Sequence, residues 1–265
     1  MRTFLRRLHA IWWRCGLLAF VVFTAWCLIA YRASADGRAA AVGDASVHVE
    51  RTATGWNFIP RAQAPQPVGL LFFSGALVDP RAYAPLARHL AQTGTPVAVI
   101  ALPRRGAFGG AEGGEVLARA DQAMRGFAGV RCWVVGGHSR GGEVASRMAA
   151  RGLPPVAGLF LAGTSHPRDI DLSGLHLPVT KLVASNDGLA SPERNARNRR
   201  RLPASTHWVT LEGGNHSQFG AYGFQPGDRF ATLPRQQQAA LIQREARALL
   251  DHAGTGPACT GGSIQ

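Results

Sequence analysis

The chain has 265 residues, which is enough for one domain of ordinary size with a real core and one additional segment. Hydrophobic residues make up 46% of the sequence and charged residues 17%, which excludes a chain that is disordered throughout. The formal net charge is +13. Part of it lies near the N-terminus, and the densest other run, 194–201, is typical of a solvated helix face. We therefore expect no nucleic acid as partner.

The N-terminal segment is typical of a membrane anchor. Arg2, Arg6, Arg7 and Arg14 precede an uncharged run of 17 residues, 15–31, which is at the lower limit for a helix that crosses a bilayer. By the positive-inside rule, the arginines predict a cytoplasmic N-terminus and a main domain outside the cytoplasm, in the periplasm.

Cleavage of this segment is an open alternative. Ala33-Ser34-Ala35 resembles a signal-peptidase site, and its use would give a secreted protein. Arg32 and the long apolar run favour an uncleaved anchor. We expect a cytoplasmic stub and anchor over 1–34, then an Ala/Gly-rich linker over 35–45.

The body, 46–252, is predicted to alternate strands and helices, and a flexible tail follows over 253–265. Strands are expected at 47–52, 55–60, 68–73, 96–102, 133–135, 156–161, 179–184 and 208–211. Helices are expected at 80–91, 115–127, after the central strand up to about 150, at 192–201 and at 235–250. After two antiparallel strands, the continuous apolar runs predict a mostly parallel sheet with helices on both faces. The Gly-rich segment 106–114 lacks the pattern of a dinucleotide site and is expected to be a rim loop.

Only two cysteines, Cys132 and Cys259, lie beyond the membrane segment, so a disulfide framework is excluded. One bridge is conceivable in an oxidising compartment. Because Cys132 falls in a predicted central strand, we expect a reduced thiol in the core.

A strand, a tight turn and a helix surround the candidate nucleophile. Gly137-His138-Ser139-Arg140-Gly141 matches G-x-S-x-G, in which small residues on both sides of the serine allow a sharp turn that exposes its hydroxyl. Ser139 is the predicted nucleophile.

A serine needs a base to take its proton and a carboxylate to orient that base. Catalytic groups in parallel sheets gather beyond the carboxyl ends of the strands. His216 follows the last strand and Asp187 the strand before it, which gives the order Ser, Asp, His. Asp169 and Asp171 are the alternative carboxylates. His166, which also follows a strand, is the weaker candidate for the base.

Attack on a carbonyl forms an oxyanion, which needs backbone N–H donors. The amide of Arg140, just after the nucleophile, should be one donor. Ala76, in the loop after the third strand, should be the other, with Gly75 beside it.

These motifs resemble the α/β-hydrolase superfamily, and in particular its small lidless bacterial esterases of the dienelactone-hydrolase type. The segments 75–91, 136–142, 185–191 and 213–228 carry the resemblance. It implies an eight-stranded, mostly parallel sheet of this fold, which here would follow the one predicted transmembrane helix. It also implies Ser139, Asp187 and His216 as nucleophile, acid and base. The sequence departs from many relatives at 74–76, where Ser-Gly-Ala replaces His-Gly or Pro-Gly-Gly.

The expected activity is hydrolysis of small carboxylic esters through an acyl-serine, with no metal ion or organic cofactor. Gly75 and Phe219 are the expected substrate contacts. The short connection over 163–176 leaves no room for a large lid. Thioester, amide, peptide or cell-envelope substrates are alternatives, as is a catalytically silent binding module. The oligomeric state is not predicted.

Overall fold

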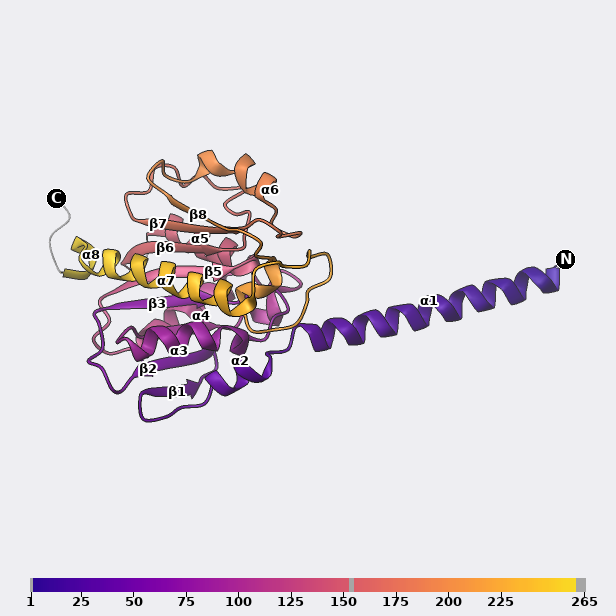
Figure 1. The fold of residues 1–265 in the computed structure, drawn as a ribbon, viewed down its shortest axis with the longest axis horizontal. Helices are drawn as coiled ribbons and strands as arrows, with labels where there is room; N and C mark the ends of the chain where they lie inside the picture. Colours follow the sequence, from indigo (N-terminus) through magenta and orange to yellow (C-terminus); the bar gives the residue numbers. More distant parts are fainter. Residues whose placement is uncertain (1, 153–154, 261–265) are drawn as a thin grey trace.

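The computed structural model describes residues 2–152 and 155–260 (Figure 1). The strands are β1 (Val47–Arg51), β2 (Gly55–Pro60), β3 (Val68–Phe73), β4 (Val97–Ile100), β5 (Cys132–His138), β6 (Val156–Ala162), β7 (Val179–Ala184) and β8 (His207–Leu211). The α-helices are α1 (Arg2–Ala30), α2 (Ala35–Ala40), α3 (Ala84–Gln92), α4 (Gly114–Arg125), α5 (Arg140–Arg151), α6 (Pro192–Arg197), α7 (Arg235–Gly254) and α8 (Pro257–Thr260). Short 3-10 helices are η1 (Pro80–Tyr83), η2 (Pro103–Gly106), η3 (Arg199–Arg201) and η4 (His216–Phe219).

The eight strands form one sheet in the order β1-β2-β4-β3-β5-β6-β7-β8. Strand β2 is antiparallel to both of its neighbours, and β4, β3, β5, β6, β7 and β8 are parallel to one another. All residues of β3, β4, β5 and β7 are buried. For β3 and β4 this is what their continuous apolar runs predict, whereas β7 also buries Thr180 and Lys181. The predicted fold class is confirmed.

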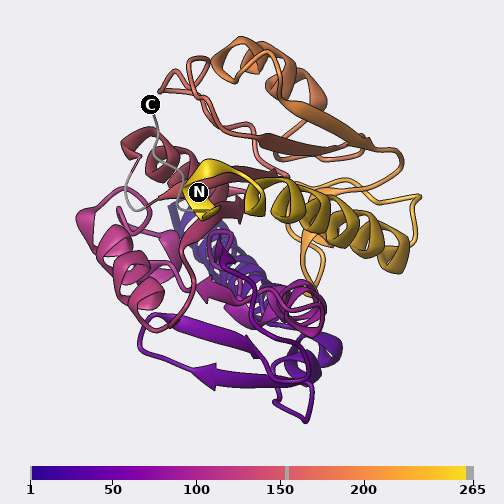
Figure 2. The ribbon, with the colours of Figure 1, turned by 90° about the vertical axis from the view of Figure 1, so that its left-hand side faces the viewer.

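Helices cover the sheet on both faces. One core joins α3 and α7 to the sheet, and the other joins α4 and α5 to its opposite face. Figure 2 shows the yellow helix α7 on one side of the sheet and the helices α4 and α5 on the other. Because the carboxyl ends of the parallel strands all lie at one edge, the loops that follow them meet there.

The predicted linker is wrong, because residues 35–40 form α2, which packs on α3 and η1. Gly37 is buried, and a side chain there would meet the carbonyl oxygens of Arg81 and Ala221 at 3.0 and 3.1 Å. Small residues let this helix approach the body closely, so its buried face has no large apolar side chains. The sequence therefore shows no apolar period from which the helix could be predicted.

The predicted flexible tail also differs from the structure. Helix α7 continues to Gly254, and α8 follows; residues 261–265 lie outside the described residues. Cys259, on α8, forms a disulfide with Cys132 on β5, so the expectation of a reduced core thiol is wrong. The bridge stabilises the end of the chain against the sheet.

Helix α1 projects from the domain, and Phe4–Ala30 is long and apolar enough to cross a membrane, the one such helix in the described part of the chain (Figure 1). The chain enters the domain directly after it. The backbone N–H groups of Asp79 and Gly223 donate to the carbonyl oxygens of Tyr31 and Ala30, at 2.9 and 2.8 Å.

Candidate active site

Ser139 occupies a sharp turn between β5 and α5, with φ 53° and ψ −117°. A positive φ is unfavourable for a residue other than glycine, so the surrounding packing must maintain this conformation. The two motif glycines explain how it does so. A Cβ atom on Gly137 would lie 2.3 Å from the carbonyl carbon of Gly141, and one on Gly141 would lie 2.1 Å from the carbonyl oxygen of Phe73. The turn is therefore possible only with glycine at both positions.

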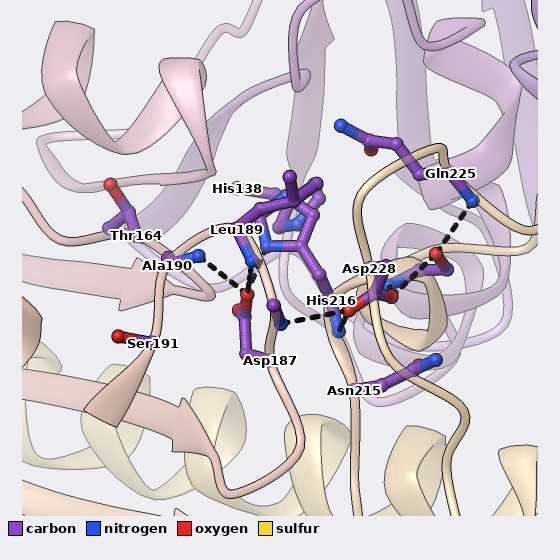
Figure 3. A network of polar contacts seen from close by, with 12 residues as sticks. His138, Thr164, Asp187, Leu189, Ala190, Ser191, Asn215, His216, Gln225 and Asp228 are labelled. Atoms are coloured by element: carbon purple, nitrogen blue, oxygen red, sulfur yellow. Dashed lines mark hydrogen bonds and ion pairs between the residues drawn. The ribbon is translucent and has the colours of Figure 1, made fainter. Parts of the chain in front are cut away.

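The ring of His216 lies against Asp187. Nδ1 of His216 donates a hydrogen bond to Oδ2 of Asp187 over 2.8 Å, and both side chains are buried. The other carboxylate oxygen, Oδ1, accepts the backbone N–H groups of Leu189 and Ala190 at 2.8 and 2.5 Å (Figure 3). These donors hold the carboxylate in place, and the carboxylate in turn orients the imidazole ring.

Ser139 and His216 line the same cavity, which has a volume of about 280 Å³. Nε2 of His216 is buried and makes no hydrogen bond to any described residue, Ser139 included. With Nδ1 protonated towards Asp187, Nε2 carries a free lone pair. The cavity thus holds a hydroxyl and a free imidazole nitrogen. The remaining residues that line it are Ala76, Gly106, Arg140, Thr164, Ser165, His166, Arg168, Leu189 and Ala190.

The two predicted oxyanion donors lie around this cavity. Ala76 and Arg140 both line it, and the backbone N–H of neither donates a hydrogen bond within the described part of the chain. Arg140 is also the first residue of α5, where the helix dipole favours negative charge. Two unused amides therefore border the space next to Ser139. The Arg140 side chain is turned to Glu112 and Glu143 instead.

Asp228 joins the loops of the acid and the base, a role that sequence reasoning missed. Its Oδ1 accepts the backbone N–H groups of Gly188 at 3.1 Å and His216 at 3.3 Å. Its Oδ2 accepts the N–H and hydroxyl of Ser217, both at 2.7 Å (Figure 3). One carboxylate thus sets the spacing between the Asp187 and His216 loops. Asp228 lies 12 residues after His216, at the end of the segment 213–228 that carries the family resemblance. That position was the only sign of its role in the sequence.

The two predicted substrate contacts lie elsewhere. Gly75 donates its N–H to the hydroxyl of Tyr83, and a Cβ there would meet His138 Nδ1 at 2.9 Å, so it is part of the packing behind the site. Phe219 is 4% exposed and stacks on His138, with ring centroids 5.4 Å apart. It borders a separate apolar cavity between α3 and α7.

His138 supports the base from behind, because its ring lies 4.4 Å from that of His216 between centroids. Burial lowers the pKa of His138 well below its usual value, so the ring stays neutral. Its Nδ1 shares a hydrogen bond with the hydroxyl of Tyr83 at 2.9 Å. A neutral ring at position 138 does not repel the positive charge that forms on His216 when it takes a proton.

The alternative acids and the alternative base do not form a comparable pair. Asp169 is exposed, and Asp171 accepts the N–H of Ser173, so neither contacts His216. His166 lines the cavity, but burial and the charges of Arg168 and Lys181 lower its pKa to about 3. Such a ring is a poor base.

Comparison with known families identifies the chain. The model of a family described as "Alpha/beta hydrolase family" matches residues 69–240, more than half of the chain and the part that carries Ser139, Asp187 and His216. The chain belongs to this alpha/beta hydrolase family. The resemblance seen in the sequence is confirmed.

Three solved structures share this fold at low sequence identity. A serine hydrolase without a lid from Xanthomonas campestris is 15% identical over 79% of this chain and 96% of that one, with a TM-score of 0.51. An esterase domain from Rhodothermus marinus is 14% identical over 76% and 95% of the two chains, with a TM-score of 0.53. A structure from work on LipS and LipT, two metagenome-derived lipolytic enzymes, is 14% identical over 72% and 96%, with a TM-score of 0.54. A comparison with curated proteins found no match.

The connection between β6 and β7, where a lid would be inserted, is short and holds no helix. Residues 163–178 form no helix or strand, and all of them are among the residues described. On this side the cavity is therefore bordered by a loop, which contributes Thr164, Ser165, His166 and Arg168.

Proposed function

We propose that this alpha/beta hydrolase is a membrane-anchored serine hydrolase that cleaves carboxylic esters through an acyl-serine intermediate. The observation that carries the proposal is the free Nε2 of His216, oriented by Asp187 and lining the same cavity as Ser139. A serine hydroxyl is a weak nucleophile by itself, and a neutral imidazole with a free lone pair is the base that activates it.

In the first step, Nε2 of His216 takes the proton of Ser139 while Oγ attacks the ester carbonyl carbon. The carbonyl oxygen becomes an oxyanion, and the free N–H groups of Ala76 and Arg140 stabilise it. When the C–O bond to the alcohol breaks, the imidazolium returns its proton to the leaving oxygen, and the acyl group stays on Ser139.

In the second step, water replaces the alcohol. His216 takes a proton from the water, whose oxygen attacks the acyl carbon, and then returns the proton to Oγ of Ser139. The products are a carboxylic acid and the free enzyme. Asp187 stays ionised throughout and stabilises the imidazolium. His216 mediates each proton transfer in this cycle, and the N–H groups of Ala76 and Arg140 donate the hydrogen bonds to the oxyanion.

The anchoring part of the proposal rests on α1. The arginines ahead of its apolar run favour a cytoplasmic N-terminus and an extracytoplasmic hydrolase domain. The Cys132–Cys259 disulfide supports this location, because such bonds persist in oxidising compartments.

A fluorophosphonate probe tests the serine chemistry, since it reacts only with an activated serine. We expect the full chain in detergent to be labelled, and Ser139→Ala to abolish the label. Ser146→Ala is the matched control, because Ser146 is buried on α5 and donates to the Gly142 carbonyl. A folded wild-type chain that resists the probe would instead favour the non-catalytic binding module.

A further inference from the structure

We propose that the catalytic edge of the domain rests on the bilayer that α1 crosses, and that the substrate is an ester held at that bilayer surface. The catalytic edge is the set of loops that follow β3, β4, β6 and β8, namely 74–79, 101–113, 163–178 and 212–234. The inference rests on the proposed function and adds its substrate class.

Helix α1 joins the domain at this edge. Its last residue, Ala30, accepts the N–H of Gly223, in the loop after His216, and Tyr31 accepts that of Asp79, in the loop that carries Ala76. Figure 1 shows α1 leaving on the side where the parallel strands end, beside the orange loop that follows β8. The anchor and the cavity therefore lie at the same edge of the sheet, where the parallel strands end.

The anchor leaves little distance between bilayer and domain. Arg14 is costly inside hydrocarbon, so the spanning part begins after it and runs through residues 15–31. At about 1.5 Å per residue these 17 residues are about 25 Å long, less than the roughly 30 Å of a hydrocarbon core. The bilayer must then reach Tyr31, which is already hydrogen-bonded to the catalytic edge.

The catalytic edge also carries exposed apolar side chains. Outside α1, the large hydrophobic residues exposed in the described chain are Val42, Leu77, Phe108 and Phe230. Leu77 follows β3, Phe108 follows β4 and Phe230 follows β8. Phe108 is 94% exposed and Phe230 82%. Aromatic side chains in this position are favourable at a membrane interface and costly in water.

Exposed arginines lie at the same edge of the sheet. Arg105, Arg168 and Arg229 belong to the loops after β4, β6 and β8, and none forms an ion pair with any described residue. Positively charged side chains near a bilayer are attracted by its anionic head groups. The combination of cations and aromatic rings fits a bilayer with anionic head groups.

A bilayer-held substrate is compatible with the size of the cavity. At about 280 Å³, it is smaller than most pockets that enclose a whole ligand. An ester at the interface needs to place only its carbonyl group against Ser139, because its acyl chain can stay in the hydrocarbon.

Fluorescent labels test the orientation without reference to activity. In the full chain with Cys15→Ser and Cys27→Ser, the remaining cysteines are joined as the disulfide, so Phe108→Cys or Phe230→Cys accepts a single nitrobenzoxadiazole label. In vesicles of phosphatidylcholine and phosphatidylglycerol, we expect shallow nitroxide lipids to quench both labels and iodide to be excluded. Val42→Cys is the control, because Val42 is also exposed but precedes β1, whose first residue lies at the opposite edge. Labels at 108 and 230 that behave like the label at 42 would overturn the proposal.

Activity provides the second test. In Phe108→Ser/Phe230→Ser, we expect the rate on a fluorogenic lipid ester in the vesicles, divided by the rate on soluble p-nitrophenyl acetate, to fall severalfold. The ratio should not change in Val42→Ser. Absence of Ser139-dependent turnover of both esters would contradict the proposed function itself. Turnover with an unchanged ratio would contradict the membrane-facing edge alone.

Discussion

Nδ1 of His216 and Oδ2 of Asp187 lie 2.8 Å apart, although 29 residues separate them in the chain. The sheet brings them together, because β7 and β8 are neighbouring parallel strands that end at the same edge. Oδ1 of Asp187 accepts two backbone N–H groups, so the backbone rather than solvent fixes the orientation of this carboxylate.

Asp187→Asn should lower kcat for a soluble ester by about 10⁴, the loss typical of a triad whose imidazole no longer has the correct tautomer. KM should change little, since the acid does not line the cavity. Asp169→Asn and Asp171→Asn are the matched controls and should retain activity. A larger loss in either control would assign the acid to the loop after β6.

Asp228→Asn should lower kcat by about 100-fold, since small misplacements of catalytic groups have effects of this size. The amide keeps one acceptor oxygen but loses the ability to accept at both oxygens from Gly188, His216 and Ser217. Asp251→Asn, at an exposed ion pair on α7, is the control. A raised KM with unchanged kcat would argue against a positioning role.

Gly141→Ala should destabilise the fold by roughly 2 kcal/mol or more and abolish labelling of Ser139, because the new Cβ would overlap the Phe73 carbonyl oxygen. Gly174→Ala is the control, since a Cβ there meets nothing within 4 Å. Chemical unfolding in detergent measures the stability. Equal midpoints for the two variants would contradict the close approach at the turn.

Cys259→Ser should lower the free energy of unfolding by about 2–5 kcal/mol, because the bridge joins cysteines 127 residues apart and restricts the unfolded chain. Activity at low temperature should remain, since α8 lies away from the catalytic edge (Figure 1). A reducing agent should reproduce the effect in the wild type and have none in the variant. An unchanged midpoint in both cases would contradict a bridge in the folded protein.

Lys181 predicts an unusual pH dependence of stability. Burial lowers its pKa to about 7, whereas the unfolded chain keeps the proton to about pH 10.4. Between these values the unfolded state binds more protons, so the stability contributed by this group rises with pH, by roughly 2 kcal/mol from pH 7 to pH 9. Urea unfolding across this range should reveal the rise, and Lys181→Met should flatten it. A wild-type profile as flat as that of the variant would contradict the shift.

The sequence predicted the elements whose patterns are local. Continuous apolar runs predict buried parallel strands, and the spacing of Gly137, Ser139 and Gly141 predicts the turn, because steric limits at each position act within a few residues. Asp187 and His216 were predictable because topology places both strand ends at one edge.

Features that depend on contacts distant in sequence were not predictable. The Cys132–Cys259 bridge requires α8 to return to β5, and no periodic pattern in the polar C-terminal segment indicates that path. Helix α2 packs through small residues such as Gly37, which give no apolar signal. Phe219 was expected in the cavity, but an aromatic residue near the base fits packing behind it equally well.

The mass of the protein during the first turnover shows directly whether Ser139 is acylated. We would mix the full chain with p-nitrophenyl acetate, quench it with acid within the first turnover, and map the modified peptide by mass spectrometry. We expect one acetyl group on Ser139 in the wild type, and none in Ser139→Ala or His216→Ala. Rapid release of nitrophenol with the acetyl group on another residue, or on none, would contradict an acyl-serine intermediate on Ser139.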